Sequence, residues 1–421
     1  MGLDNRIHTP EGLRDIYGKE LKLKSFIEDR LLDVLKLYHY DMIETPLIEY
    51  FNVFNGDKGT ASSNQMYKLF DRENNTLVIR PDITPSIARS VAKYFANEKL
   101  HIRLSYKGQT FMNRPRLHGN LNGVTQLGAE LIGDDESAAD GEIISMVVES
   151  MLKLGLSEFQ VSVGQVDFFR GIVDEYKLDD ASKEALRDAI VNNKIFVVKD
   201  LSKKAGIHDD AVEILLGMTS SFDNDEILKR AKSCVSNETS LNAIDRLSKV
   251  YQILKLYGYE SYVSFDLSLL SDYDYYSGIV FKGYTYGSGS PVVGGGRYNG
   301  LISKFGVDMP SVGYAFVVDE LMFAMSNQHL SLDDDNDGVM VLYLNEDLEQ
   351  AVRIAKALRD KDMSVLLMRK SSKNTVDDYV EHAKAHEISR IIYISEDVKL
   401  INVNDKSEKT VNLEGVLGGA L

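Results

Sequence analysis

The segment from Phe111 to Gly133 constrains the fold of this chain most strongly. It reads FMNRPRLHGNLNGVTQLGAELIG. An apolar start, a polar loop and a second, mostly apolar run predict two strands joined by a loop. The second strand contains Gln126-Leu127-Gly128-Ala129-Glu130 and is followed by Gly133. The sequence therefore predicts a sheet in this part of the chain, with polar side chains on one of its strands.

The charge balance and the cysteine count exclude several classes of function. Lys and Arg number 48 and Asp and Glu number 64, which gives a formal net charge of -16. Such a chain repels a phosphate backbone, and nucleic-acid affinity rests on lysine and arginine, so the balance argues against RNA as a partner. The single cysteine, Cys234, excludes an intrachain disulfide and a cysteine-cluster zinc site, in keeping with a reducing cytosol.

Length and hydropathy indicate a cytoplasmic protein with more than one domain. A chain of 421 residues is long enough for two or three cores. No apolar run approaches the length that spans a membrane, and the first residues lack a basic segment leading into an apolar stretch. We therefore expect a soluble protein of the cytoplasm without membrane contact.

Strand and helix patterns divide the first 325 residues into two strand-containing parts with a helical part between them. Residues 66–70 and 76–79 flank a polar turn and predict a hairpin. Between about 168 and 256, helical runs dominate and strand signals are few, which predicts a helical insertion. Strand character returns at Gly278–Phe281, ahead of a glycine-rich stretch from Gly283 to Gly300.

A polar segment, residues 326–337, predicts a linker to a second domain. In residues 338–421, strand and helix patterns alternate. Strands are expected at Gly338–Leu344, Ser364–Met368 and Arg390–Ile394, and helices at Leu348–Arg359 and Thr375–His386. This alternation predicts a small, mostly parallel α/β domain.

Two patterns resemble metal sites but are incomplete. The run from Asp333 to Gly338 matches the opening of an EF-hand loop, yet Leu344 stands where the bidentate acid belongs. His382 and His386 lie one helical turn apart, but no third ligand is evident. We therefore expect neither a metal nor a cofactor.

Six separated segments resemble the catalytic core of histidyl-tRNA synthetases, and they follow the order of that family. They are Thr9–Gly12, Arg80–Pro85, Phe111–Gly133, Asp274–Gly278, Gly294–Leu301 and Val312–Ala315. The resemblance covers most of residues 1–325 and implies a class II aminoacyl-tRNA synthetase-like α+β core, an antiparallel sheet flanked by helices. The tail from about Gly338 is similar, more loosely, to the anticodon-binding domain of the same family.

The resemblance implies a histidine pocket. Carried over position by position, its residues are Asp82, Thr84, Gln126, Glu130, Tyr275 and Tyr276. The first three hold the ammonium group in that family, and the other three read the imidazole. This division is chemically reasonable, because a carboxylate accepts from one ring N–H while a phenol bonds the other nitrogen. Taken singly, Glu130 is a strand carboxylate paired elsewhere and the tyrosines belong to the core; the joint pattern favours the pocket.

The nucleotide side departs from the family. Met112 stands in place of the arginine of the second signature, and Arg114 in place of an acid two residues later. Ser271 and Glu320 stand at two further arginine positions. A charge-assisted hydrogen bond contributes roughly 1.5 to 3 kcal/mol, so losing three arginines predicts negligible activation of histidine. Arg114 shares a strand face with Met112 and is a candidate substitute for one of them.

A synthetase core with a histidine pocket and no activation machinery is similar to the regulatory subunits of ATP phosphoribosyltransferase. That resemblance implies a non-catalytic subunit that pairs with a short-form catalytic subunit in the first step of histidine biosynthesis. It further implies histidine as the feedback ligand and a homodimer within a hetero-oligomer, with tRNA binding lost. Two alternatives stay open: a divergent, active histidyl-tRNA synthetase, and a free-standing histidine sensor.

Overall fold

The computed structural model divides the chain into two compact units, Met1–Leu330 and Ser331–Leu421. It describes residues 7–55, 61–114, 121–217, 223–270, 276–330, 338–395 and 397–412. Helix α10 (Val318–Asn327) ends the first unit and extends past the predicted domain end at residue 325. Most of the predicted linker, residues 331–337, lies outside the described residues, as do the acids of the EF-hand-like run.

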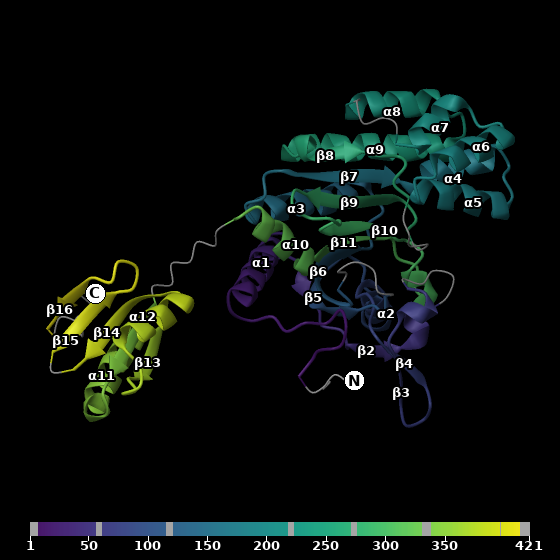
Figure 1. The fold of residues 1–421 in the computed structure, drawn as a ribbon. Helices are drawn as coiled ribbons and strands as arrows, with labels where there is room; N and C mark the ends of the chain where they lie inside the picture. Colours follow the sequence, from purple (N-terminus) through teal and green to yellow (C-terminus); the bar gives the residue numbers. More distant parts are fainter. Residues whose placement is uncertain are drawn as a thin grey trace, which may run out of the picture. The chain divides into compact units, whose positions relative to one another are not determined.

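Within the described residues of the first unit, eight strands form one sheet in the order β1-β5-β6-β11-β10-β9-β7-β8 (Figure 1). The strands are β1 (Asp41–Met42), β5 (Ile102–Phe111), β6 (Gly123–Ile132), β7 (Phe159–Gln165), β8 (Val263–Phe265), β9 (Ile279–Thr285), β10 (Val293–Arg297) and β11 (Ser311–Val317). Pairing is antiparallel from β5 through to β7, whereas β1 and β8 join the two ends in parallel. This sheet, flanked by helices, confirms the predicted α+β class.

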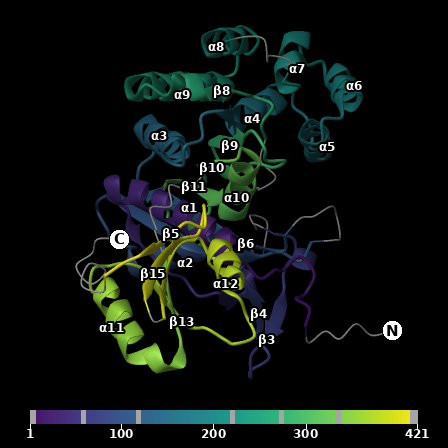
Figure 2. The ribbon, with the colours of Figure 1, turned by 60° about the vertical axis from the view of Figure 1, so that its left-hand side comes forward.

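One face of the sheet packs against helices. Helices α1 (Gly18–Leu37), α3 (Ser137–Lys153) and α10 lie along this side (Figure 2). Leu127, Ala129 and Leu131 of β6 belong to the same buried core as the apolar side chains of these helices. Because successive strand residues point to opposite faces, residues 126, 128 and 130 face the other side of the sheet.

The opposite face carries a second, smaller core. A three-stranded antiparallel sheet, β2 (Ile48–Tyr50), β4 (Thr76–Ile79) and β3 (Lys68–Phe70), leads into helix α2 (Thr84–Tyr94). The pairing of β3 with β4 confirms the predicted hairpin. Ile87 and Val91 of α2 pack in a buried cluster with Leu104 and Tyr106 of β5. The turn between β4 and α2 is thereby held beneath the main sheet.

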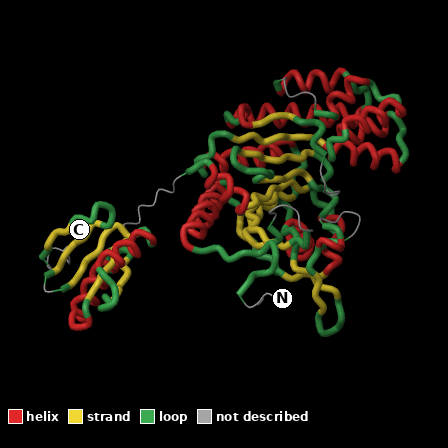
Figure 3. The backbone as a smooth tube through the Cα atoms, in the orientation of Figure 1, coloured by secondary structure: helices red, strands yellow, loops and turns green. Residues whose placement is uncertain are grey.

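A helical region separates β7 from β8 (Figure 3). Its helices are α4 (Val166–Glu175), α5 (Asp180–Val191), α6 (Ile195–Ala205), α7 (Asp209–Leu215), α8 (Asn224–Ser233) and α9 (Glu238–Tyr257). Several start at side chains that cap the free N–H groups of the first turn: Asp179, Asp223 and Asn237 each accept from the third residue that follows. The helical run therefore agrees closely with the stretch expected between 168 and 256.

The C-terminal unit is a five-stranded sheet with helices packed against it. Its elements are β12 (Gly338–Tyr343), α11 (Leu348–Arg359), β13 (Val365–Arg369), α12 (Val376–Ala385), β14 (Ile388–Ile394), β15 (Val398–Asn402) and β16 (Glu408–Thr410). Strands β13, β12 and β14 pair in parallel, as the alternation predicts, whereas β15 and β16 extend the sheet antiparallel. In both units, no helix among the described residues is long and apolar enough to cross a membrane.

Candidate functional site

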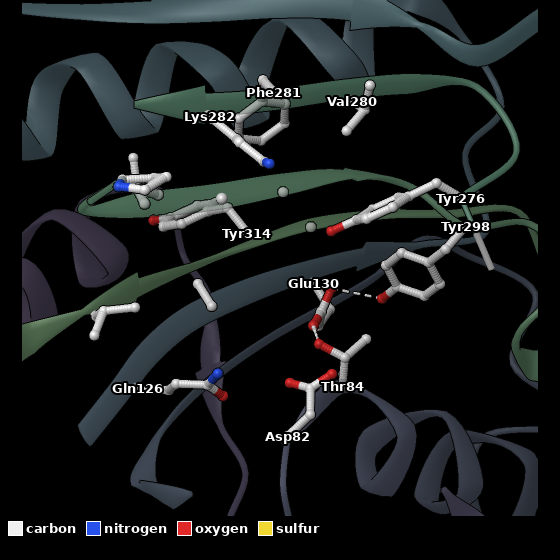
Figure 4. A pocket seen from close by; sticks show the side chains of 17 residues that line it. Asp82, Thr84, Gln126, Glu130, Tyr276, Val280, Phe281, Lys282, Tyr298 and Tyr314 are labelled. Carbon is white, nitrogen blue, oxygen red and sulfur yellow. Dashed lines mark hydrogen bonds between the residues drawn. The ribbon is translucent and has the colours of Figure 1, made fainter. Parts of the chain in front are cut away.

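A cavity of about 200 Å³ lies on the sheet face opposite the large helices, above the turn that leads into α2 (Figure 4). Five of the six residues predicted for the histidine pocket line it: Asp82, Thr84, Gln126, Glu130 and Tyr276. Tyr275 lies outside the described residues. Drug-sized ligands occupy pockets of roughly 300 to 1,000 Å³, so the volume of this cavity suits a smaller molecule, of amino-acid size.

Two local features bring these side chains together. Gln126 and Glu130 stand four residues apart on β6 and so project from the same face, away from the core that holds Leu127 and Ala129. Asp82 and Thr84 come from the turn into α2, where Asp82 Oδ1 accepts from the backbone N–H of Ile83 at 2.7 Å. The polar pair on β6 thus meets the polar pair at the start of α2.

Glu130 is the most deeply buried of these acids, with 1% of its surface exposed. Thr84 Oγ1 donates to Glu130 Oε1 at 2.7 Å, and the Tyr298 hydroxyl donates to Oε2 at 2.5 Å. Burial raises the pKa of Glu130 to about 8, although the two hydroxyls act in the opposite direction. A β-carbon at Gly313, opposite on β11, would overlap this carboxylate, so glycine is required there.

This raised pKa makes the stability of the empty protein depend on pH. In the unfolded chain Glu130 ionises near 4.5, whereas in the folded chain it ionises near 8. Between these values the unfolded chain releases a proton that the folded chain keeps, so the free energy of unfolding falls as pH rises. We expect Glu130→Gln to remove this dependence. The difference in the free energy of unfolding between this variant and wild type should shift in favour of the variant by a few kcal/mol, at most about 5, as the pH rises from 4.5 to 8.

Urea unfolding at pH 5, 6.5 and 8 measures this difference. Glu73→Gln, in the exposed turn between β3 and β4, is the matched control and should run parallel to wild type. Parallel curves for Glu130→Gln as well would contradict the raised pKa.

Asp82 adds a second acid to the same wall. Burial raises its pKa to about 6, opposed by hydrogen bonds from the backbone of Ile83 and Thr84 and by the charge of Arg80. Arg80 itself is held away from the cavity, because its Nη1 donates to the carbonyl of Thr45 at 2.8 Å and its Nε to the carbonyl of Gln109 at 2.9 Å. The cavity therefore has a wall of acids and acceptors.

Together with apolar residues and glycines of the central strands, three tyrosines and a lysine also line the cavity. They are Tyr276, Tyr298, Tyr314 and Lys282. The Tyr276 ring lies against the glycine run, since a β-carbon at Gly296 would come within 2.8 Å of it. The resemblance to the synthetases includes Tyr298 in the glycine run but does not assign it to the pocket, and the strand expected at Gly278–Phe281 ends one residue before Lys282. Period-two alternation along β9, continued from Val280, would have placed Lys282 on the pocket face.

Strand β10, which borders the cavity, is anchored from behind by buried charges. Arg297, at its end, donates from Nε to Asp140 Oδ1 of α3 at 2.8 Å. Arg246 of α9 donates from Nε to the other oxygen of Asp140 at 2.7 Å. Asp140 and Arg297 are almost fully buried. Two arginines from distant segments therefore share one carboxylate.

The positions that depart from the synthetase pattern lie away from this cavity where they are described. Met112 follows β5, and the exposed Arg114 turns back so that its Nη2 lies 3.2 Å from Met112 Sδ. Glu320, in the first turn of α10, accepts from Ser288 Oγ at 3.3 Å. Ser271 lies outside the described residues. Neither Met112 nor Glu320 is among the residues that line the cavity.

The candidate metal ligands give no site in the described part of the chain, where no group of three or more His, Cys, Asp or Glu could hold a metal ion. His382 and His386 instead pack ring against ring, with centroids 4.1 Å apart, and His386 Nδ1 lies 2.8 Å from the carbonyl oxygen of His382. This pair caps the end of α12.

Comparisons with known proteins show the family and the fold. Residues 12–321 match the family described as histidyl-tRNA synthetase. The ATP phosphoribosyltransferase regulatory subunit of Acetivibrio thermocellus is 33% identical over 86% of this chain and 86% of its own length. That of Clostridium novyi is 32% identical over 97% and 98%, so the C-terminal unit is shared with it.

A solved structure gives the same result. The crystal structure described as an ATP phosphoribosyltransferase regulatory subunit/histidyl-tRNA synthetase from Bacillus halodurans is 29% identical, with a TM-score of 0.81 over 92% of this chain and 98% of that one. Similarity in sequence, in fold and along almost the whole length places the chain in one branch of the synthetase family. The chain belongs to the ATP phosphoribosyltransferase regulatory subunits, a histidyl-tRNA synthetase-like family.

Proposed function

We propose that the cavity binds free histidine and that the chain, through this ligand, regulates an ATP phosphoribosyltransferase. One observation carries the proposal: Glu130 lies buried in the wall of an amino-acid-sized cavity, with hydroxyls of Thr84 and Tyr298 on its two oxygens. A carboxylate held in this way is suited to accept from an imidazole N–H. The relatives are named regulatory subunits of ATP phosphoribosyltransferase, and we take that enzyme as the one that is regulated.

The part of the cavity formed by Asp82 and Gln126 suits the ammonium group of the ligand. Asp82 offers a carboxylate, and Gln126 Oε1 is a buried acceptor that has no hydrogen-bond partner among the described residues. An unsatisfied buried polar atom costs roughly 1 to 3 kcal/mol, so a ligand that donates to it gains affinity from the pairing. We place the second imidazole nitrogen at the Tyr276 hydroxyl, which points into the cavity in Figure 4.

Reconstitution with the catalytic partner tests the proposal. The chain is co-expressed with a short-form ATP phosphoribosyltransferase catalytic subunit, and transferase activity is measured with and without the chain and with and without histidine. We expect the chain to co-purify with the catalytic subunit and to raise its activity, and histidine to inhibit the complex. A coupling free energy of roughly 1 to 3 kcal/mol between the two sites corresponds to a change in ligand affinity of about 5- to 150-fold.

Two other outcomes of that experiment would have different meanings. A free-standing histidine sensor would bind histidine but leave the activity of the catalytic subunit unchanged. Inhibition by histidine of the catalytic subunit alone, to the same degree as in the complex, would place the regulatory site on the partner and contradict the proposal.

A homodimer within the complex is part of the proposal. Support comes from exposed apolar side chains near the β1 edge of the large sheet. Tyr50 is 57% exposed, Tyr94 is 67% exposed, and both line one surface hollow. Met42, on β1 itself, is 56% exposed. Large exposed apolar groups that gather in one place are typical of protein interfaces, and a second copy of the chain is the partner that the class II core implies.

A further inference from the structure

Lys282 is a cation in a cavity whose other charged groups are acids. Of the described residues that line the cavity, Asp82 and Glu130 carry carboxyl groups, and Lys282 is the one lysine or arginine. Figure 4 shows the Lys282 ammonium group directed into the cavity, on the side across from Asp82 and Gln126. The cavity therefore has an acidic wall and, facing it, a basic group.

Space in front of Lys282 is kept open by Gly294. The two residues are cross-strand partners on β9 and β10, so their side chains project from the same face. A β-carbon at Gly294 would meet only the carbonyl oxygen of Phe281, at 3.9 Å, which is ordinary contact. Packing thus requires glycine at 296, against the Tyr276 ring, but not at 294. The absent side chain at 294 leaves a place for part of a ligand beside the lysine.

A free α-amino acid matches this distribution of charge. Its ammonium group suits Asp82 and the unpaired Gln126 Oε1, and its carboxylate then needs a cation on the other side. The described positions at which a synthetase has arginine hold Met112 and Glu320, and neither lines the cavity. We propose that Lys282 binds the carboxylate of the amino-acid ligand and so restricts the pocket to free histidine, against derivatives whose carboxyl group is reduced or esterified. This inference rests on the proposed function.

Calorimetry of the full chain with two ligands tests it. L-Histidinol keeps the ammonium and imidazole of L-histidine but has a hydroxymethyl group in place of the carboxylate. We expect wild type to bind histidine roughly 10- to 100-fold more tightly than histidinol, which is the effect of one charge-assisted hydrogen bond. Lys282→Met should lose that factor for histidine and leave histidinol affinity unchanged, so that the ratio falls to about 1.

Two further variants separate a lost charge from a damaged fold. Lys282→Arg keeps a cation and should keep most of the preference for histidine. Lys99→Met, at an exposed position outside the cavity, should behave as wild type with both ligands. If Lys282→Met binds histidinol as wild type does, the pocket is intact and the loss for histidine belongs to the carboxylate contact.

The possible failures are distinguishable. If wild type binds histidine and Lys282→Met keeps the full preference for histidine over histidinol, the role of Lys282 is wrong and the proposed function stands. If wild type binds neither ligand, the proposed function is wrong, and the role of Lys282 is wrong with it.

Discussion

Histidine-dependent exchange of pyrophosphate into ATP should stay at background when the full chain is incubated with ATP, Mg²⁺, histidine and labelled pyrophosphate. Activation brings a triphosphate against a carboxylate, and both groups are negative. Cations must therefore offset the charge that builds up in the transition state, and one phosphate-clamping arginine can be worth about a thousandfold in rate. Met112 and Glu320 supply none. We expect activity at least about a thousandfold below that of a histidyl-tRNA synthetase assayed in parallel.

The control for this experiment is binding of histidine to the same preparation. Exchange at background together with measurable histidine affinity means that the pocket is intact and the activation step is missing. Strong histidine-dependent exchange would instead identify the chain as a divergent synthetase. It would also indicate that Arg114, which lies beside Met112, substitutes for the missing arginine.

Replacing Glu130 by Gln should weaken histidine binding by about 100-fold. Hydrogen bonds to charged groups contribute roughly 1.5 to 3 kcal/mol, and the upper part of that range applies because Glu130 is buried and its charge is weakly screened. The amide still fills the volume of the carboxyl group between Thr84 and Tyr298. The loss therefore reports the charge rather than a cavity.

Calorimetry at pH 8.5 is the measurement, because that pH is above the pKa of about 8, so that most of wild-type Glu130 is ionised before the ligand enters. Glu73→Gln, exposed and outside the cavity, should bind histidine as wild type does. Since Glu130→Gln is expected to be at least as stable as wild type at this pH, unfolding is not an explanation for weak binding. Unchanged affinity would show that the imidazole does not contact Glu130.

The sequence predicted the parts of the site that local rules determine. Gln126 and Glu130 lie on one strand, and strand alternation alone places them on the same face. Asp82 and Thr84 precede and begin a helix, a position fixed by the proline and the apolar spacing that follow. The contact between these two pairs was expected only from the resemblance. The pairing of β5 with β6 does not determine which segment packs against the face that carries Gln126 and Glu130.

The residues that were missed depend on contacts between distant segments. Alternation along β9 gives the face on which Lys282 lies, but the register with β10 that sets it beside Gly294 is not revealed by any local pattern. Tyr298 meets Glu130 across a separation of 168 residues. Strand β16 was missed for another reason: it is exposed and polar throughout, so its place at the sheet edge leaves no apolar alternation in the sequence.

The carboxylate that Arg246 and Arg297 share has a mechanical consequence. Arg246 belongs to the longest helix of the inserted region, and Arg297 ends the strand that leads directly into Tyr298. Moving that helix away from the strand would leave Asp140, buried on α3, with one arginine in place of two, and weakening a buried ion pair is unfavourable. The shared carboxylate therefore connects α9, α3 and β10, and β10 runs directly into Tyr298, whose hydroxyl donates to Glu130. We expect a partner that displaced the inserted helices to disturb the Tyr298 side of the cavity through this connection.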